Sequence, residues 1–387
     1  MLRLEMLPAE CGDCLWLEYG DPGEPHIMLI DGGVKNTAKR LEARIQKAIR
    51  ERRASSLHID LLVVTHIDND HIDGILKLLE EGRLPLTFGD IWFNGNRQLA
   101  TLPPPTDREK RPDTLGGIEE EILRPDLLGL REGDRLSRVL ADPKNKLPWN
   151  KAFGGNAATT FIEGSPPPAR TLPGELKLTL LGPPLNRLRI LSNKWTDVLG
   201  DFARVNQFGP TPEREDTLGR RDTWPPALRN EKGLDDSPAN GASIALLAEY
   251  ENKGVLLTGD AFAPDLEAAL GWIQTERGKA GVPLIIEAMK VPHHGSFKNL
   301  TSKILEKVRC LRYLISTDGS VHRHPDHEAL LRIIKYSTTR PVLSFNYSGE
   351  TTRNWHDRQQ DVLDQGFPIY DTEYPTRAEE GLVVDFG

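Results

Sequence analysis

The distribution of hydrophobic residues near the start of the chain predicts alternating strands and helices. Short apolar runs at 2–7, 14–19 and 26–30 indicate three strands, the last two joined by a Gly-Asp-Pro-Gly turn. Residues 37–54 place Leu41, Ile45 and Ile49 on one face, which predicts an amphipathic helix. A strand at 59–64, a helix near 74–82 and a strand at 90–93 continue the pattern, as expected of a layered α/β protein.

The regular pattern fails between residues 97 and 240. Proline runs at 103–105, 166–168 and 183–184 interrupt any long element, and only 176–181 predicts a strand. The stretch 206–238 is rich in Pro, Arg, Asp and Glu, which is typical of a mobile segment. We expect 97–240 to be an insertion that borders the active site and selects substrate. A merely tolerated surface excursion is an equally weighted alternative.

The alternation returns after the insertion. Apolar runs predict strands at 242–250, 254–258, 284–291, 311–316, 341–346 and 382–386. Helical spacing predicts helices at 264–273, 299–308, 326–336 and 356–364. The two halves together predict one domain over 1–387, with two facing sheets and helices outside.

Four metal-binding side chains follow the strand predicted at 59–64. The stretch 65–74 reads Thr-His-Ile-Asp-Asn-Asp-His-Ile-Asp-Gly and contains His66, Asp68, Asp70 and His71. Two imidazoles and two carboxylates in so short a loop exceed what one metal ion usually takes, so two adjacent ions are predicted. The alternative, a polar turn with Asp73 as the N-cap of the next helix, explains only one of these residues.

This stretch resembles the His-x-His-x-Asp-His signature of the metallo-β-lactamase superfamily. Asp68 replaces the second histidine, as in the branch typified by the hydrolase domain of the DNA-uptake protein ComEC. Further stretches match that branch in order, and they are Gly12-Asp13 with 30–33, then 257–260, 290–296 and 324–328. The resemblance implies an α/β fold, an αββα four-layer sandwich with a long irregular insertion.

The resemblance also implies a ligand set. One metal ion takes His66 and Asp68, the other takes Asp70, His71 and His324, and Asp260 bridges the two. Asp31 is expected to orient the signature loop by hydrogen bonds without touching metal.

The superfamily usually supplies one more histidine before the bridging aspartate, but residues 75–259 contain none. His293 or His294 is expected to fill the gap. Side chains alternate along an extended chain, so one of the two should reach the metals or a substrate oxygen while the other supports it.

The implied chemistry is hydrolysis by an activated water. The water is held near Asp70 and Asp260 and attacks phosphorus or a carbonyl carbon. His294, Ser296 or the backbone of Gly295 would hold the leaving or non-bridging oxygen. The oxygen-rich first site makes manganese plausible beside zinc for the two divalent ions.

Phosphodiesterase or nuclease-like activity is the favoured reading, because the resemblance is to a branch associated with nucleases. Hydrolysis of a lactone, thioester or small cyclic phosphodiester is the alternative, and a non-catalytic metal-binding module is a third. A closed pocket would favour the small substrate. An open groove bordered by basic residues would favour a polynucleotide, and these residues are Arg187, Arg189, Arg204, Arg220 and Arg221.

Composition bears on where the protein is located and on what it binds. The chain has 387 residues, 38% hydrophobic and 27% charged, and no apolar run approaches the ~20 residues of a membrane span. The N-terminus lacks the basic start and apolar core of a signal peptide, so a cytoplasmic location is expected. Cys11, Cys14 and Cys310 cannot form a disulfide framework. A net charge of −8 gives a nucleic-acid substrate no support from the overall field.

Overall fold

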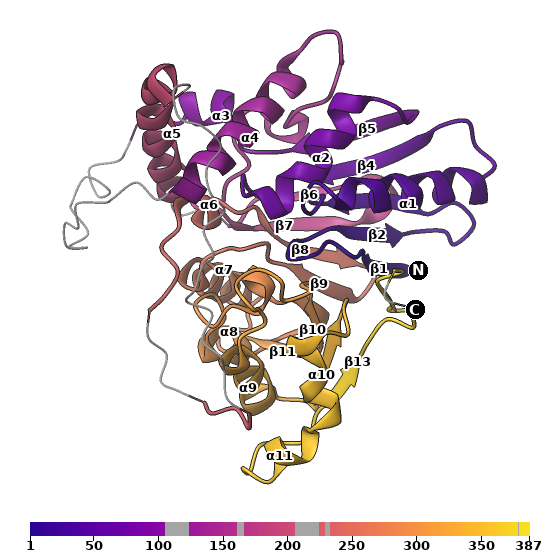
Figure 1. Ribbon diagram of the computed structural model, residues 1–387, viewed down its shortest axis with the longest axis vertical. Helices are drawn as coiled ribbons and strands as arrows, with labels where there is room; N and C mark the ends of the chain where they lie inside the picture. The colour runs from indigo at the N-terminus through magenta and orange to yellow at the C-terminus, as the bar shows by residue number, and fades with distance from the viewer. Residues whose placement is uncertain (105–123, 161–165, 206–223, 229–232, 378) are drawn as a thin grey trace.

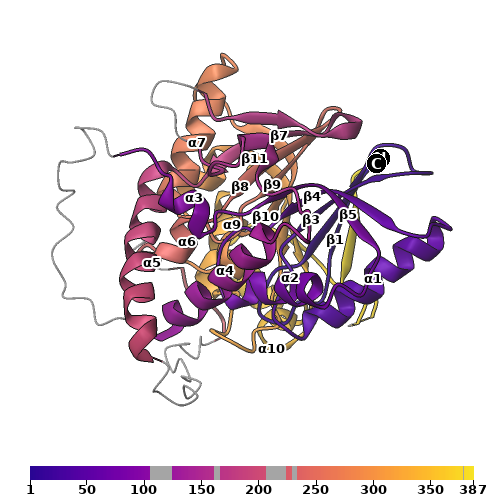
Figure 2. The same cartoon turned by 90° about the horizontal axis from the view of Figure 1, so that it is seen from above.

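Two β-sheets face each other and carry helices on their outer surfaces (Figure 1). The computed structural model describes residues 1–104, 124–160, 166–205, 224–228, 233–377 and 379–387. Viewed from above in Figure 2, α1 and α2 lie on one side of the strands and α7 on the other. The architecture is therefore the four-layer α/β sandwich of the metallo-β-lactamase fold, with an insertion.

The first sheet has the order β14-β1-β2-β3-β4-β5. Its strands are β1 (Leu2–Met6), β2 (Leu15–Tyr19), β3 (His26–Ile30), β4 (Leu57–Val63), β5 (Leu86–Trp92) and β14 (Leu382–Asp385). The predicted hairpin of β2 and β3 is confirmed, and β3, β4 and β5 are parallel. Helices α1 (Thr37–Glu51) and α2 (Asn69–Glu81) make the crossovers between these parallel strands. Strand β14 pairs with β1, which brings the two chain ends together (Figure 1).

The second sheet has the order β13-β12-β11-β10-β9-β8-β7-β6. Its strands are β6 (Ala169–Thr171), β7 (Lys177–Gly182), β8 (Ala245–Tyr250), β9 (Lys253–Leu257), β10 (Leu284–Lys290), β11 (Val308–Ile315), β12 (Val342–Phe345) and β13 (Asp371–Glu373). Strands β9 to β13 are parallel, while β6, β7 and β8 pair antiparallel. The helices between and after them are α7 (Ala263–Glu276), α8 (Ser302–Glu306), α9 (His327–Tyr336), α10 (Glu350–Asp357) and α11 (Gln359–Leu363).

Three hydrophobic clusters hold the layers together. The central one joins the two sheets, with Leu17 and Leu61 from the first and Leu178 and Leu246 from the second. The other two pack each sheet against its own helices. Because side chains alternate along a strand, a buried strand contributes side chains to both a central and an outer cluster. No helix in the described ranges is both long and apolar enough to cross a membrane.

Helix α2 begins earlier than the sequence predicts. It starts at Asn69 with Asp68 at its N-cap position, so the alternative in which Asp73 is the N-cap is wrong. Backbone contacts to neighbouring loops fix this start, because Gly32 N donates to His71 O and Asp13 N donates to Asp70 O. Asp70 and His71 therefore lie in the first turn of a helix and not in an open loop.

The region 97–240 contains more regular structure than its prolines indicate. It includes α3 (Asn96–Ala100), α4 (Arg124–Ala141), α5 (Leu185–Val205), α6 (Pro238–Gly241) and the short 3₁₀ turns η1 (Lys151–Phe153) and η2 (Pro173–Glu175). The strand predicted at 176–181 is present as β7. The proline runs at 166–168 and 183–184 fall between these elements, where they break nothing. Much of the predicted mobile stretch 206–238 lies outside the described residues.

Candidate metal centre

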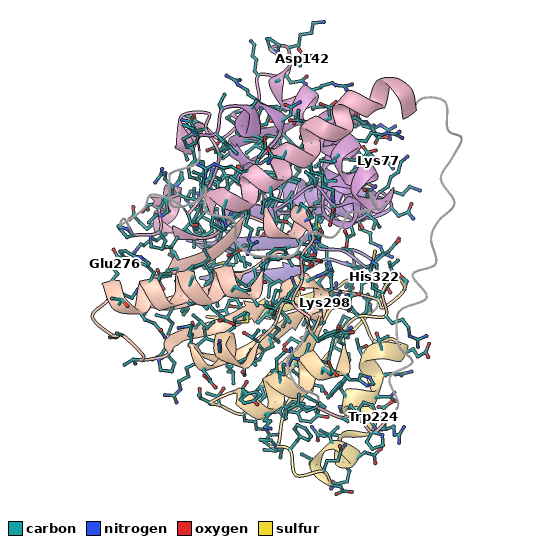
Figure 3. All side chains as sticks on the ribbon, turned by 90° about the vertical axis from the view of Figure 1, so that its left-hand side faces the viewer. Lys77, Asp142, Trp224, Glu276, Lys298 and His322 are labelled. Atoms are coloured by element: carbon teal, nitrogen blue, oxygen red, sulfur yellow. The ribbon has the colours of Figure 1, made fainter. Side chains whose placement is uncertain are left out.

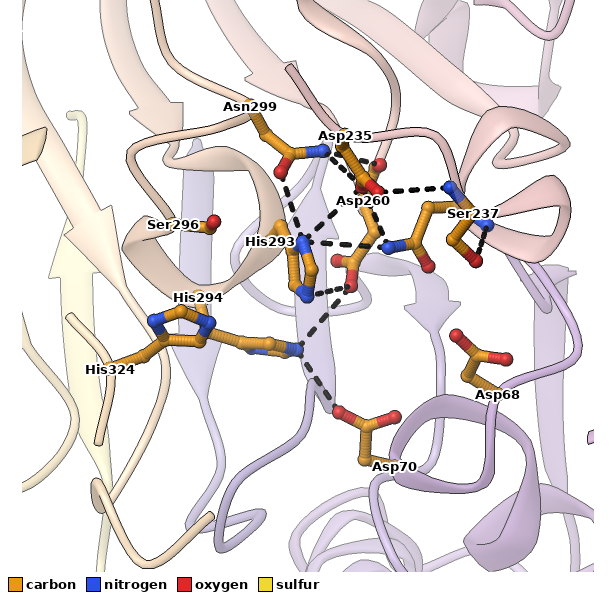
Figure 4. Close-up of polar contacts among 12 residues, drawn as sticks. Asp68, Asp70, Asp235, Ser237, Asp260, His293, His294, Ser296, Asn299 and His324 are labelled. Atoms are coloured by element: carbon orange, nitrogen blue, oxygen red, sulfur yellow. Dashed lines mark hydrogen bonds and ion pairs between the residues drawn. The ribbon is translucent and has the colours of Figure 1, made fainter. Parts of the chain in front are cut away.

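The predicted ligands converge because they follow neighbouring strand ends. His66 comes after β4, Asp260 after β9, and His293 and His294 after β10 in the 3₁₀ turn η3 (Pro292–Gly295). Strands β9 and β10 are parallel, so their carboxyl ends meet at the same sheet edge. Figure 4 shows His293 and His294 facing Asp260, with Asp68 and Asp70 on the other side.

Each of the four histidines is held through its Nδ1 atom. Nδ1 of His71 lies 2.8 Å from Asp31 Oδ2, and Nδ1 of His294 lies 2.8 Å from the backbone oxygen of Ser316. Nδ1 of His293 lies 3.0 Å from Asn299 Oδ1. Nδ1 of His66 lies between the hydroxyls of Thr65 and Ser243, at 3.0 and 3.1 Å.

These partners settle which ring nitrogen carries the hydrogen. A carbonyl oxygen such as Ser316 O can only accept, so Nδ1 of His294 donates and its Nε2 is the nitrogen that can exchange a hydrogen for a metal ion. The carboxylate of Asp31 fixes His71 in the same way. This arrangement is the usual one for histidines that bind metal through Nε2.

Four ligand atoms enclose a point. Nε2 of His71 lies 3.2 Å from Nε2 of His294 and 3.4 Å from Asp260 Oδ2. Nε2 of His294 lies 3.2 Å from Asp70 Oδ2 and 3.7 Å from Asp260 Oδ2, and His71 Nε2 lies 3.9 Å from Asp70 Oδ2. Tetrahedral ligands at zinc bond lengths lie about 3.3 Å apart, so the spacing fits one ion.

A second set of atoms adjoins the first through Asp260. Nε2 of His66 lies 3.5 Å from Asp68 Oδ2 and 3.9 Å from Asp260 Oδ2. Nε2 of His293 lies 3.8 Å from the same Asp260 oxygen. We call His66, Asp68, Asp260 and His293 the first subsite, and Asp70, His71, His294 and Asp260 the second subsite.

Unpartnered polar atoms support this assignment. Nε2 of His66 and Oδ1 of Asp260 are both buried without a hydrogen-bond partner within the protein. A buried polar atom without a partner costs about 1–3 kcal/mol, so such atoms call for a ligand. His66, His71 and Asp260 offer ligand atoms within 4.8 Å of one another, which fits a divalent cation.

The electrostatics of the site are dominated by carboxylates. Burial by itself would lower the pKa of His294, but the charges of Asp260 and Asp13 raise it to about 10. Burial also opposes protonation of His293, whose pKa Asp260 and Asp235 raise to about 8. Burial would raise the pKa of Asp260, but the adjacent histidines His71 and His294 hold it well below its usual range. The site is built to attract positive charge, and cations compete there with protons.

Asp13, from the predicted Gly12-Asp13 match, is not available to a metal ion. Its Oδ2 lies 2.6 Å from Nζ of Lys290, and both side chains are buried. Its Oδ1 lies 3.4 Å from Nδ1 of His294. Asp13 therefore neutralises a buried lysine and supports His294 from behind, although it lies close enough to His71 and His294 to resemble a ligand.

Both histidines of the predicted pair face the centre, so the expectation that only one would do so is wrong. The expectation assumed an extended chain, in which adjacent side chains point to opposite sides. His293 and His294 instead have φ values of 48° and 52°, in the left-handed region. Two successive residues of this kind turn both rings the same way, and such strained backbone is concentrated at functional sites.

His324 lies at the edge of this cluster. Its ring centroid is 5.4 Å from that of His293, and its Nδ1 lies 3.6 Å from Asp326 Oδ1. Figure 4 draws no contact from His324 to the carboxylates of the centre, whereas Nε2 of His294 lies 3.2 Å from Asp70 Oδ2, so the role of His324 as a ligand stays a prediction. Ser296 is buried directly after η3, and its hydroxyl accepts from Lys298 N at 3.4 Å. Asp31 lies beneath the centre, where it also accepts from Thr65 N at 2.7 Å.

Sequence reasoning missed several residues that support the site, namely Asp235, Asn240, Ser243 and Asn299. Ser243 Oγ accepts from the backbone N of Asp260 at 3.2 Å, besides contacting His66. Asp235 and the two asparagines surround His293. Only their proximity to the 257–260 and 290–296 stretches would have indicated these residues, since isolated Asp, Asn and Ser carry no signature of their own.

The arginines proposed to border a groove are partly engaged elsewhere. Arg187 pairs with Asp265 at 2.9 Å, and Arg189 donates to the carbonyl oxygens of Pro103 and Pro104. The side chains of Arg204, Arg220 and Arg221 lie outside the described residues. A cavity of about 330 Å³ lies beside Arg189, between α3 and α5, and no ligand of either subsite lines it.

One family model matches part of the chain. Residues 14–87 match the family model described as the metallo-beta-lactamase superfamily, and this range includes the signature loop. No curated protein matches the sequence. Among solved structures, the chain is similar to a mutant of the CmlA beta-hydroxylase at 10% identity and a TM-score of 0.35. The match covers 100% of this chain and 54% of the other, so the chain spans about half the length of that protein.

The fold and the site agree with the family match. A match to the metallo-beta-lactamase superfamily over residues 14–87, with His and Asp clusters at the strand ends, implies a metal-dependent hydrolase or a related enzyme. The particular features of this chain are Asp68 in the stretch 65–74 and the His293-His294 pair, both members of which face Asp260.

Proposed function

We propose that the protein is a metal-dependent hydrolase that cleaves phosphodiester bonds. The observation that carries the proposal is the spacing of the second subsite, where Nε2 of His71 and Nε2 of His294 lie 3.2 to 3.9 Å from each other and from the Oδ2 atoms of Asp70 and Asp260. The first subsite shares Asp260, so the donor set suits two adjacent divalent ions.

Divalent ions bound at these residues would acidify a water molecule and stabilise the negative charge that develops on the substrate. The chain itself supplies the orientation. Asp70 is 28% exposed and Asp68 is 33% exposed, whereas the histidines His66 and His71 are fully buried. Substrate and water therefore reach the centre from the carboxylate side, where Asp70 and Asp68 can accept hydrogens from the attacking water.

An anionic substrate is supported by the residues beside the centre. Lys298 follows the histidine pair by a few positions, and His322 and Arg323 precede His324. All three are exposed, and Arg323 Nη2 lies 3.4 Å from Glu350 Oε1. Figure 3 shows Lys298 and His322 on the same side of the molecule. A phosphodiester carries the negative charge that a lysine or an arginine side chain attracts, whereas a lactone or thioester group carries none.

The test uses metal-stripped protein refilled with Mn²⁺ or Zn²⁺. The substrates are bis-p-nitrophenyl phosphate and single-stranded DNA, with a lactone and a thioester assayed in parallel. We expect phosphodiester cleavage to return with metal and to be absent in Asp260→Asn. Protein that binds two ions and cleaves only the lactone or thioester would overturn the phosphodiester assignment while leaving the metal centre intact.

A further inference from the structure

His293 is the least enclosed of the four histidines at the centre. Its side chain is 22% exposed, whereas those of His66 and His71 are fully buried and that of His294 is 3% exposed. Its backbone also lies in the left-handed region, at φ 48°. A strained and partly exposed ligand needs groups around it to keep it in place.

Those groups come from the end of the insertion and from the loop after β10. Asp235 Oδ2 lies 3.5 Å from His293 Nδ1. The same oxygen accepts from Nδ2 of Asn240 and from Nδ2 of Asn299, each at 2.8 Å. Asn299 Oδ1 in turn lies 3.0 Å from His293 Nδ1. Figure 4 shows this network above His293, on the side away from Asp70.

Asp235 is the centre of the network. Its side chain is only 8% exposed, and its Oδ1 accepts from the backbone N of Ser237 at 3.1 Å. Asn299 also donates to the backbone oxygen of Asp260 at 3.1 Å. The Asp235 carboxylate thus links the end of the insertion to His293. Through Asn299 it is also linked to Asp260, which both subsites share.

We propose that Asp235 is a positioning residue that fixes His293 as a ligand of the first subsite, so that the end of the insertion decides whether the centre holds one ion or two. This inference rests on the proposed metal centre. A carboxylate behind a ligating histidine fixes the direction of its ring and raises its basicity, and its loss typically costs 10–100-fold in metal affinity.

The two subsites should respond differently to the loss of Asp235. Without His293, the first subsite keeps only His66, Asp68 and the shared Asp260. The second subsite keeps Asp70, His71, His294 and Asp260, none of which contacts Asp235 in the network described above. Loss of Asp235 should therefore weaken the binding of one ion and leave the binding of the other unchanged.

The experiment is a calorimetric titration of metal-stripped protein with Zn²⁺ and with Mn²⁺. Asp235→Asn keeps the size of the side chain and removes its charge. The matched control is Asp236→Asn, the same change at an adjacent exposed position. We expect Asp235→Asn to bind one ion as the wild type does and the other 10–100-fold more weakly, with Asp236→Asn unchanged.

A double-mutant cycle separates positioning from a general effect on folding. In a His293→Gln background, Asp235→Asn should cause no further loss of affinity, because the residue on which it acts is gone. Two ions bound with wild-type affinity by Asp235→Asn, or equal losses in both backgrounds, would overturn the inference. A wild-type protein that binds no ion would overturn the metal centre itself, and the inference with it.

Discussion

The Nε2 atoms of His71 and His294 lie 3.2 Å apart, although 223 positions separate the two residues in the sequence. Each ring is fixed from behind, one by Asp31 and the other by the backbone oxygen of Ser316. At this distance the two lone pairs cannot face each other, so a hydrogen or a cation lies between the two nitrogens. A cation competes with that hydrogen, and the predictions below follow from that relationship and from the groups that maintain it.

Removing the shared carboxylate should abolish metal-dependent activity. Asp260→Asn takes a charged ligand from both subsites, so we expect at least a 100-fold loss of hydrolysis and loss of at least one bound ion. Metal content by elemental analysis and initial rates check this. Asp142→Asn, at an exposed position away from Lys298 and His322 in Figure 3, is the control and should behave as the wild type.

Asp31 should matter for metal affinity without being a ligand. Its carboxylate accepts from Thr65 N, Thr65 Oγ and His71 Nδ1. Asp31→Asn leaves an amide that cannot accept all three, so we expect metal affinity to fall 10–100-fold. Competition with a chromogenic chelator measures it, and an affinity within twofold of the wild type would show that His71 does not depend on Asp31.

The buried Lys290–Asp13 pair should be costly to break from one side. Lys290→Met leaves the Asp13 carboxylate buried without its partner, and we expect the free energy of unfolding to fall by about 3–5 kcal/mol. The double variant Lys290→Met with Asp13→Asn should recover part of this loss, since no unpaired charge remains. Urea denaturation of metal-free protein provides the measurement, and additive losses would contradict a direct pair.

Glycine is required at position 12 because the backbone of Asp70 passes close to it. A Cβ atom there would lie 1.8 Å from the carbonyl oxygen of Asp70, which belongs to the second subsite. Gly12→Ala should therefore displace Asp70 and reduce both stability and metal affinity. Gly82→Ala is the matched control, because nothing lies within 4 Å of a Cβ there even though its φ is +54°. That control should lose about 1 kcal/mol of stability and no metal affinity.

Stability should fall in acid partly through Glu18. Burial would raise its pKa, but a hydrogen bond from Trp16 and the charges of Arg44 and Arg3 lower it below its usual 4.5. A lowered pKa in the folded state means that the stabilisation is full above pH 4.5 and is lost as the pH falls through the folded value. Unfolding free energies of the wild type and Glu18→Gln should differ near neutral pH and converge in acid. A constant difference down to acidic pH would contradict this assignment.

Local sequence was sufficient for much of the fold. The spacing of Leu41, Ile45 and Ile49 predicted a helix, and α1 occupies that place because this apolar face packs on the first sheet. Apolar runs predicted β1, β2, β3, β7 and β10 to within a few residues. The insertion was harder, because prolines at element boundaries concealed α4 and α5, whose interiors have ordinary helical composition.

The sequence by itself determined which residue types could bind metal, since His66, Asp68, Asp70 and His71 lie within one short segment. Only the tertiary structure decided how they are arranged. The start of α2 depends on backbone hydrogen bonds from Gly32 and Asp13. The direction of His293 and His294 depends on a left-handed turn fixed in part by the bond from His293 N to Gly259 O. Asp235 reaches Asn299 across 64 positions of sequence. Such contacts join segments that are distant in the chain, and residue spacing along the chain carries no information about them.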